Sequence, residues 1–402
     1  PLFALPSRFG RTVNADWFSS TVPARTGMAV RFPPLVMLMC GIFAAGTVLT
    51  SGCRSPDASG QPAEDASTAD SSAVTSVDTT ASADPAFPVR AVTLDARRQP
   101  EDGLLKDLRR LGATHVTLTT FAWQRRADTP RLELHTDGSW YSESDRGIRA
   151  LSRKADSLDM GVILKPHIWI GGYDSDGQSR HAIGFDTEAE WETWEADYRR
   201  FVLHYARLAA EVEAHALVVG TELTRAATSR PAFWRDLIAE IRTVYDGRLT
   251  YAANWHEAYR EIPFWDALDY IGVQAYFPIA DRDDPPLTDL VRGWAAHRDS
   301  LRALHERTDK PVLFTEMGYR SVAFAGREPW RWPEEDDSAP PAPDVQARCY
   351  RAFFATFAPE SWFAGAIVWK WHPESESRRP TGFTPQNKPA EHVLRRWFRG
   401  TG

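Results

Sequence analysis

The sequence predicts an α/β fold, a single (β/α)8 barrel, on three observations. From residue 88 onward short apolar runs alternate with longer amphipathic segments, eight such runs occur, and polar or aromatic side chains follow most of them. This alternation is typical of βα units around a parallel sheet, and eight strands are the number that closes a barrel. The expected strands are 89–94, 115–121, 161–165, 216–219, 248–253, 269–275, 311–315 and 365–369.

Between these strands the clearest helix is expected at 188–213. Its large apolar side chains recur every three or four residues, which places them on one helical face. Thr187 and Glu190 have the spacing of a capping box, in which the two side chains bond the free backbone N–H groups at a helix start. Trp191 and Trp194 belong to the apolar face, so we expect them to pack against the barrel.

Residues 1–53 are expected to form a leader. From Met28, the expected start of translation, a cationic residue, an apolar run and a small-residue ending lead to Cys53 in "LTSGC". This ending resembles a bacterial lipoprotein box, in which the cysteine receives the lipid, so we expect lipidation at Cys53. An ordinary secretory signal with an incidental cysteine stays open, as does a membrane-spanning helix over 33–49.

Residues 54–87 are expected to be a disordered acidic linker, because Ser, Ala, Asp and Thr cannot bury enough surface to offset their ordering entropy. The barrel domain then occupies 88–402.

Only Cys349 lies beyond Cys53, so the domain has no internal disulfide. The net charge of −7 offers no basic face for nucleic acid. We expect a monomer, attached by its lipid to a membrane of the bacterial cell envelope, in the periplasm or on the outer surface.

Two glutamates stand at the ends of expected strands. Glu222 follows 216–219 through a glycine and a threonine, and Glu316 follows 311–315 directly. The carboxyl ends of barrel strands meet at one mouth, and the fourth and seventh strands face each other across it. Paired carboxyl groups suit glycoside hydrolysis, in which one donates a proton and the other attacks the anomeric carbon. Either glutamate alone could instead be a helix cap or a loop ion pair.

Several polar and aromatic side chains at the same mouth suit a sugar ligand. A pyranose ring presents flat C–H faces that stack on indole, and the chain holds 16 Trp residues. His167 fits a buried core histidine equally well. The candidate substrate-binding residues are His167, Trp169, Asn254, Trp255, Tyr276, Trp369 and Trp371.

Signatures of other chemistries are missing from the sequence. It contains no HExxH, no paired CxxC, no Walker sequence and no GxSxG. Metal-dependent hydrolysis, nucleotide use and serine catalysis therefore lack support, and we expect neither a metal nor another cofactor.

Five segments in order, "LKPHIW", "VVGTEL", "YIGVQAYFP", "FTEMGYRS" and "IVWKW", resemble glycoside hydrolase family 113 over most of 89–372. This is a clan A family of retaining β-mannanases on a (β/α)8 barrel. The resemblance implies Glu222 as acid/base, Glu316 as nucleophile and Tyr276 as the tyrosine beside the nucleophile. It implies Trp369 or Trp371 under the reactive sugar, and His167 in contact with the sugar at the cleavage point.

The sequence departs from the family at two places. The first strand ends in "VTLDARRQ", without the aromatic and glycine-rich segment of the mannanases, which leaves the subsites on that side open. An insertion at 326–343 follows the seventh strand and carries Trp330 and Trp332. It is either a lid or platform over the cleft or a solvated surface loop.

The expected function is a retaining glycoside hydrolase of the endo-β-mannanase kind, acting on a β-linked hexose polysaccharide or oligosaccharide, with β-1,4-mannan implied by the resemblance. Two alternatives stay open. One is a glycosidase acting on another β-glycan, such as a glucan or a cell-wall sugar, because specificity for one hydroxyl depends on a few contacts. The other is a glycan-binding lipoprotein without catalytic activity, although the presence of both glutamates argues against it.

Overall fold

The computed structural model describes residues 87–137, 140–171, 178–256, 258–332, 338–373 and 379–400. The predicted leader, with Cys53, and the predicted linker up to residue 86 lie outside these ranges. Phe87, assigned by sequence to the linker, is buried and packs against Phe353, Phe354 and Phe363. The folded domain therefore includes one residue more than predicted, because an aromatic ring there completes the core.

The predicted barrel is confirmed, with eight parallel strands closed into a ring by the pairing of β1 with both β2 and β9. A short strand, β3 (Glu133–Leu134), pairs antiparallel with β2 outside this ring. The third to eighth barrel strands are therefore labelled β4 to β9. The barrel strands are β1 (Val89–Leu94), β2 (His115–Gln124), β4 (Gly161–Ile170), β5 (Ala216–Thr221), β6 (Arg248–Asn254), β7 (Tyr270–Gln274), β8 (Val312–Met317) and β9 (Phe363–Trp371).

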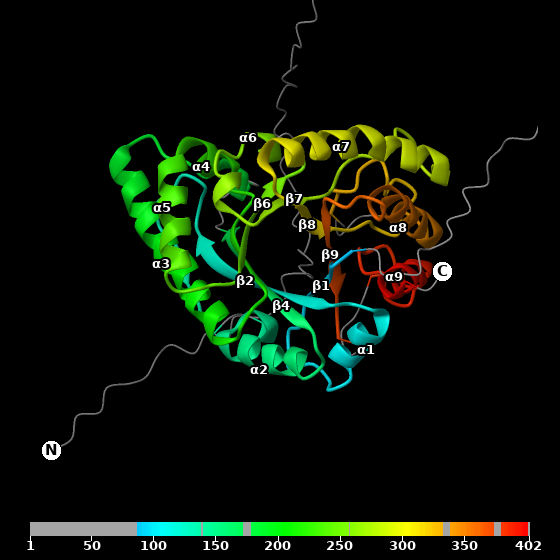
Figure 1. The fold of residues 1–402 in the computed structure, drawn as a ribbon, viewed down its shortest axis with the longest axis horizontal. Helices are drawn as coiled ribbons and strands as arrows, with labels where there is room; N and C mark the ends of the chain where they lie inside the picture. Colours follow the sequence, from blue (N-terminus) through cyan, green and yellow to red (C-terminus); the bar gives the residue numbers. More distant parts are fainter. Residues whose placement is uncertain are drawn as a thin grey trace, which may run out of the picture. The chain divides into compact units, whose positions relative to one another are not determined.

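Helices surround the strands as an outer layer (Figure 1). They connect consecutive parallel strands, as βα units require. The helices are α1 (Leu104–Leu111), α2 (Asp145–Asp156), α3 (Glu188–Glu211), α4 (Thr224–Ser229), α5 (Pro231–Arg242), α6 (Ala258–Glu261), α7 (Leu287–Thr308), α8 (Pro343–Phe357) and α9 (Pro389–Arg399). Among the described helices, none has both the length and the hydrophobicity that a membrane crossing requires.

The start of α3 confirms the predicted capping box. The Thr187 hydroxyl accepts from the Glu190 N–H at 3.3 Å, and the Glu190 carboxylate accepts from the Thr187 N–H at 3.1 Å. Trp191 and Trp194 are buried on the inner face of α3, as expected, and the Trp194 indole N–H donates to the Gln124 side chain on β2. The cap thus fixes the point at which the long apolar face of α3 meets the barrel.

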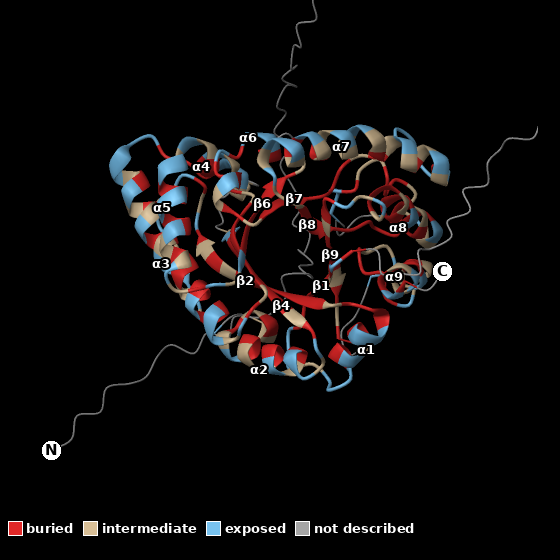
Figure 2. Ribbon diagram, in the orientation of Figure 1, coloured by how far each residue is buried: buried red, intermediate tan, exposed pale blue. Residues whose placement is uncertain are grey.

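The core has two parts, one on each face of the curved sheet. Figure 2 shows the strands mostly buried, while the helices are buried toward the strands and exposed on their outer sides. Alternate residues of one strand serve both parts: Leu217 and Val219 face the helices, and Ala216 and Val218 fill the barrel interior. Burial on both faces explains why the strands are apolar runs without polar alternation. The filled interior leaves the mouth as the place for a site.

The ring closes tightly between β1 and β9. Gly365 pairs with Val89 and has φ +146°, a backbone conformation that L side chains rarely adopt. A Cβ atom at Gly365 would lie 1.9 Å from the Val89 carbonyl oxygen. Glycine is therefore required where the first and last strands meet.

Candidate active site

Glu222 lies one residue beyond β5, where the chain turns into α4. Its backbone N–H donates to the Ala252 carbonyl of β6 at 2.8 Å, and its φ is +57°, in the left-handed region. This conformation costs free energy for a residue with a Cβ atom, and such residues cluster at functional sites. The Glu222 side chain is 21% exposed, so its carboxylate reaches the mouth and has access to water.

Glu316 lies within β8, three strands away from β5 around the ring, and is buried. Tyr276, just beyond β7, donates its hydroxyl proton to Glu316 Oε2 at 3.0 Å. Burial, together with the charge of Glu316, raises the pKa of Tyr276 well above its usual value. The phenol therefore stays protonated and remains a donor to the carboxylate.

Lys165 on β4 is the cationic partner of Glu316. Its amine is fully buried and donates to Glu316 Oε1 at 2.5 Å, to Gln274 Oε1 at 2.8 Å and to the Thr315 carbonyl at 2.9 Å. Three acceptors match the three donors of an ammonium and leave no place for an amine lone pair. Burial lowers the pKa of Lys165, whereas the Glu316 carboxylate opposes that shift. The contacts favour an ammonium paired with a carboxylate.

Gln274, the last residue of β7, connects the two glutamates. Its Oε1 accepts from Lys165 and, at 3.1 Å, from the Thr315 hydroxyl, while its Nε2 donates to Glu222 Oε1 at 3.3 Å. A continuous chain of polar contacts therefore runs from Glu222 through Gln274 and Lys165 to Glu316. The sequence placed both glutamates at one mouth, and the structure joins them through these two side chains.

Arg180 and His167 flank the other side of Glu222. Arg180, in the short 3₁₀ turn η2 (Arg180–Ala182), pairs with Glu222 Oε2 at 3.2 Å and donates to His167 Nδ1 at 2.7 Å. Burial and the positive charges of Arg180 and Lys165 hold the pKa of His167 well below its usual value. The ring is therefore neutral, with its proton on Nε2. That buried nitrogen has no hydrogen-bond partner among the described residues, so it is a donor available to a ligand.

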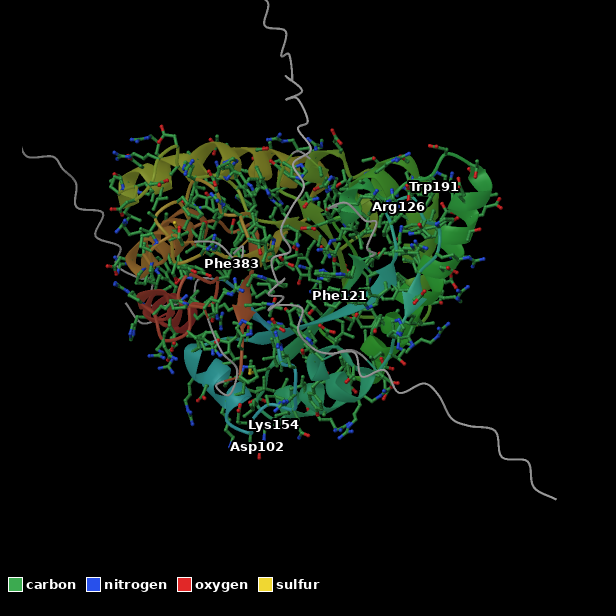
Figure 3. The ribbon with its side chains drawn as sticks, turned by 180° about the vertical axis from the view of Figure 1, so that it is seen from behind. Asp102, Phe121, Arg126, Lys154, Trp191 and Phe383 are labelled. Atoms are coloured by element: carbon green, nitrogen blue, oxygen red, sulfur yellow. The ribbon has the colours of Figure 1, made fainter. Side chains whose placement is uncertain are left out.

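Aromatic side chains gather next to Glu316. Tyr276, Trp369 and Phe383 form a buried cluster, and Trp255, beyond β6, packs against it. The indole nitrogen of Trp369 is buried and, within the described ranges, has no hydrogen-bond partner. In the view of Figure 3, Phe121 and Phe383 lie toward the middle of the ring, whereas Asp102 and Lys154 lie at its outer edge.

The remaining predicted residues occupy different places. Trp169 is 43% exposed at the end of β4, with Trp123 and Phe121 of β2 beside it at 6.2 and 6.0 Å between ring centroids. Asn254 is buried at the end of β6, where it pairs in register with Gln274. Trp371 packs into the core between sheet and helices, separately from the Trp369 cluster. Trp369 therefore fits a position beneath a sugar better than Trp371 does.

Sequence reasoning missed five residues around this mouth: Gln274, Arg180, Asp95, Lys370 and Trp140. Gln274 lies inside the predicted strand 269–275 and Arg180 lies in a loop, and neither carried a signal of its own. Near the end of β1, Asp95 pairs with Lys370, and the Lys370 amine lies 5.8 Å from the centre of the Trp140 ring. An aromatic side chain thus stands near this part of the mouth, contributed by the chain before α2. In the described part of the chain, no group of three His, Cys, Asp or Glu side chains suits a metal ion.

Comparison with known proteins decides the family. The sequence model of Glycoside Hydrolase Family 113 matches residues 95–389. The chain belongs to glycoside hydrolase family 113. It is therefore a glycoside hydrolase, as the two glutamates at the mouth predicted. A comparison with curated protein sequences found no match.

Solved structures of family 113 members resemble this member closely in fold. A β-mannanase from Alicyclobacillus acidocaldarius, solved in complex with ManMIm, is 29% identical and superposes with a TM-score of 0.66 over 79% of this chain and 98% of its own. A second family 113 β-1,4-mannanase is 27% identical, with a TM-score of 0.65 over 78% of this chain and 98% of its own. A β-glucuronidase from Ruminococcus gnavus, 12% identical at a TM-score of 0.52 over 77% of this chain and 50% of its own, shares the barrel alone.

Proposed function

We propose that this family 113 member is a retaining β-1,4-mannanase. The observation that carries the proposal is the pair Glu222 and Glu316, which lie in contrasting surroundings at one mouth and are joined through Gln274 and Lys165. The β-mannanase activity named for two structures 27–29% identical to this chain supports mannan as the substrate.

In the first step Glu316 attacks the anomeric carbon, and Glu222 donates a proton to the departing glycosidic oxygen. The buried carboxylate suits the nucleophile, since Lys165 and Tyr276 orient its two oxygens and balance its charge. The 21% exposure of Glu222 lets the water of the second step reach it. In the second step Glu222 takes a proton from water, which attacks the anomeric carbon and releases Glu316. Retention requires the two carboxyl groups to lie about 5–5.5 Å apart.

The sugar in this scheme would lie on Trp369, and His167 Nε2 would donate to one of its hydroxyls. Both side chains carry a buried polar hydrogen without a partner among the described residues. Burying such groups costs free energy unless a ligand satisfies them, which supports their assignment to the subsite at the cleavage point.

The test is hydrolysis of β-mannan, glucomannan, cellulose and chitin oligosaccharides, with the anomeric form of the first product followed by NMR. We expect turnover of mannan with a β-anomer first, and a loss of kcat of about 10³-fold or more in Glu316→Gln. Glu222→Ala should lose activity on mannan but still react with aryl mannosides, whose leaving groups need no proton. An α-anomer first would refute retention, and turnover of another glycan alone would refute mannan.

We further propose that Cys53 is lipidated and anchors the chain to the cell envelope. The leader pattern ending in "LTSGC" supports this. Cells making the full chain should incorporate labelled fatty acid, and Cys53→Ser should abolish both the label and membrane fractionation. Cys40→Ser is the matched control, because that cysteine precedes the predicted cleavage point and should leave labelling unchanged. Labelling that survives Cys53→Ser would refute the anchor.

A further inference from the structure

Within the insertion at 326–343, the described residues 326–332 bring two exposed tryptophans to the mouth. Trp330 is 42% exposed and Trp332 is 56% exposed. Across the described residues, the large hydrophobic side chains that stand out as exposed are these two, Trp169 at the end of β4, and Leu134. Exposed aromatic surface on a soluble domain commonly marks a binding site.

Both indoles contact aromatic side chains of the candidate active site. Trp330 stacks on Trp255, with 5.0 Å between ring centroids and 22° between planes. Trp332 meets Phe383 at 5.3 Å and Trp369 at 6.3 Å, edge to face in both cases. Phe383 in turn contacts Tyr276, whose hydroxyl donates to Glu316. The aromatic surface is thus continuous from the nucleophile's partner to the insertion.

The backbone on both sides of these residues is held in place. The Gly326 carbonyl accepts from the Ile279 N–H at 2.8 Å, and the Ala342 N–H donates to the Ser321 carbonyl at 2.7 Å. Between the two tryptophans, Arg331 lies over the Phe324 ring at 5.0 Å and pairs with Glu328 at 3.2 Å. Arg331 fastens the segment to the domain while its two neighbours contact the strand-end aromatics. A solvated loop would need neither arrangement.

We propose that Trp330 and Trp332 are sugar-stacking residues, which extend the substrate cleft beyond Trp255 and Trp369 to hold a β-linked hexose oligomer. Each indole is covered in part by another ring and keeps exposed surface that a flat pyranose C–H face can cover. Covering that apolar surface contributes favourably to the binding free energy. A ligand long enough to reach both rings gains this contribution from each of them. The proposal rests on the proposed function and names residues of its substrate cleft.

The test compares a short substrate with a long one. Trp330→Ala/Trp332→Ala should lower kcat/KM on mannohexaose by about tenfold or more. The loss of kcat/KM on 4-nitrophenyl β-mannoside should be several-fold smaller, because that substrate occupies only the cleavage point. Trp330→Phe/Trp332→Phe should recover most of the loss. Trp397→Ala, which removes a half-buried indole on α9, is the matched control and should affect both substrates alike. Equal losses on both substrates in the double alanine variant, or no loss on mannohexaose, would overturn the proposal.

A binding measurement separates this proposal from the proposed function. In the Glu316→Gln background, mannohexaose and cellohexaose are titrated against the protein with and without the two alanine substitutions. Binding weakened about tenfold by the substitutions would support the stacking role even if the wild type hydrolysed no mannan. Unchanged binding would refute the stacking role even if mannan were hydrolysed, and binding of neither sugar would refute it too, leaving a protein partner as the occupant.

Discussion

Lys165 and Glu316 form a buried ion pair whose partners stand on opposite sides of the ring, on β4 and β8. Removing one partner leaves the other charge buried without compensation, which costs far more than the net value of the pair. The sequence placed Lys165 at a strand end. It could not show that the amine crosses the barrel, because hydropathy carries no information on which side chains meet. Gln274 and Arg180 escaped prediction for the same reason.

At this scale we expect Lys165→Met to reduce kcat on mannan by at least about a hundredfold and the free energy of unfolding by roughly 3 kcal/mol. Combining it with Glu316→Gln should restore part of the stability and none of the activity, because the double variant buries no charge. Urea denaturation and steady-state kinetics measure the two effects. Lys106→Met, at an exposed position on α1, is the control. A Lys165→Met protein as stable as the control would contradict the ion pair.

The strands and the long helix α3 show how far single elements could be predicted. All eight predicted barrel strands exist, and six of them extend further along the chain than expected: β2, β4, β5, β6, β8 and β9. β4 continues from Lys165 to Ile170 through Pro166, a residue that normally interrupts a strand. The strand tolerates this proline because the hydrogen-bonded pairing of β4 with β5 ends at Leu164, before the proline. On its other side, the pairing of β4 with β2 continues to Ile170. His167 and Trp169 therefore lie on the strand itself, which fixes their position at the mouth.

The capping box of α3 allows an element-scale prediction. Thr187→Ala removes the acceptor for the Glu190 N–H and should lower the free energy of unfolding by about 1 kcal/mol. Thr193→Ala, six residues further along the same helix and partly exposed, should have no such cost, because alanine favours helix interiors. Chemical denaturation of both variants measures the difference. If both substitutions had the same effect, the cap would not contribute to stability.

The barrel as a whole closes at the end opposite its mouth around two histidines. His115 begins β2, and its ring lies 4.4 Å from that of His215, just before β5. Burial, with the nearby His215 and Arg90, lowers the pKa of His115 to about 3. The unfolded chain then binds a proton near pH 6.5 that the folded barrel does not bind. Stability therefore falls as the pH drops from about 6.5 toward 3, and is unaffected by His115 above that window.

For the whole molecule, acidification from pH 7 to pH 5 should cost about 2 kcal/mol through His115 alone. His115→Gln should make the free energy of unfolding less dependent on pH across this interval. His135→Gln, at an exposed histidine, should leave the dependence as in the wild type. Urea denaturation of each variant and of the wild type at half-unit pH steps gives the slope of the free energy of unfolding against pH. Identical slopes for His115→Gln and the wild type would show that His115 is not the responsible group.

The fold class was predictable because the sequence itself shows short apolar runs alternating with amphipathic segments, and the apolar runs can be counted as strands. The contact that closes the ring was not predictable, since Gly365 and Val89 approach each other across the whole length of the domain. Likewise, the sequence assigned Phe87 to the linker because the segment 54–87 as a whole is rich in Ser, Ala, Asp and Thr. Its ring nevertheless packs among three phenylalanines more than 260 residues away.

Both ends of the domain lie at the end of the barrel away from the glutamates. β1 enters there at Val89, and α9 ends there, where Phe398 packs against Gly112 just before β2 and Arg399 donates to the Arg110 carbonyl. A molecule held by either terminus is held from behind, with its sugar-binding face turned outward. An insoluble polysaccharide fibre does not diffuse to an enzyme. An enzyme fixed to a surface in this orientation would present its cleft directly to such a fibre.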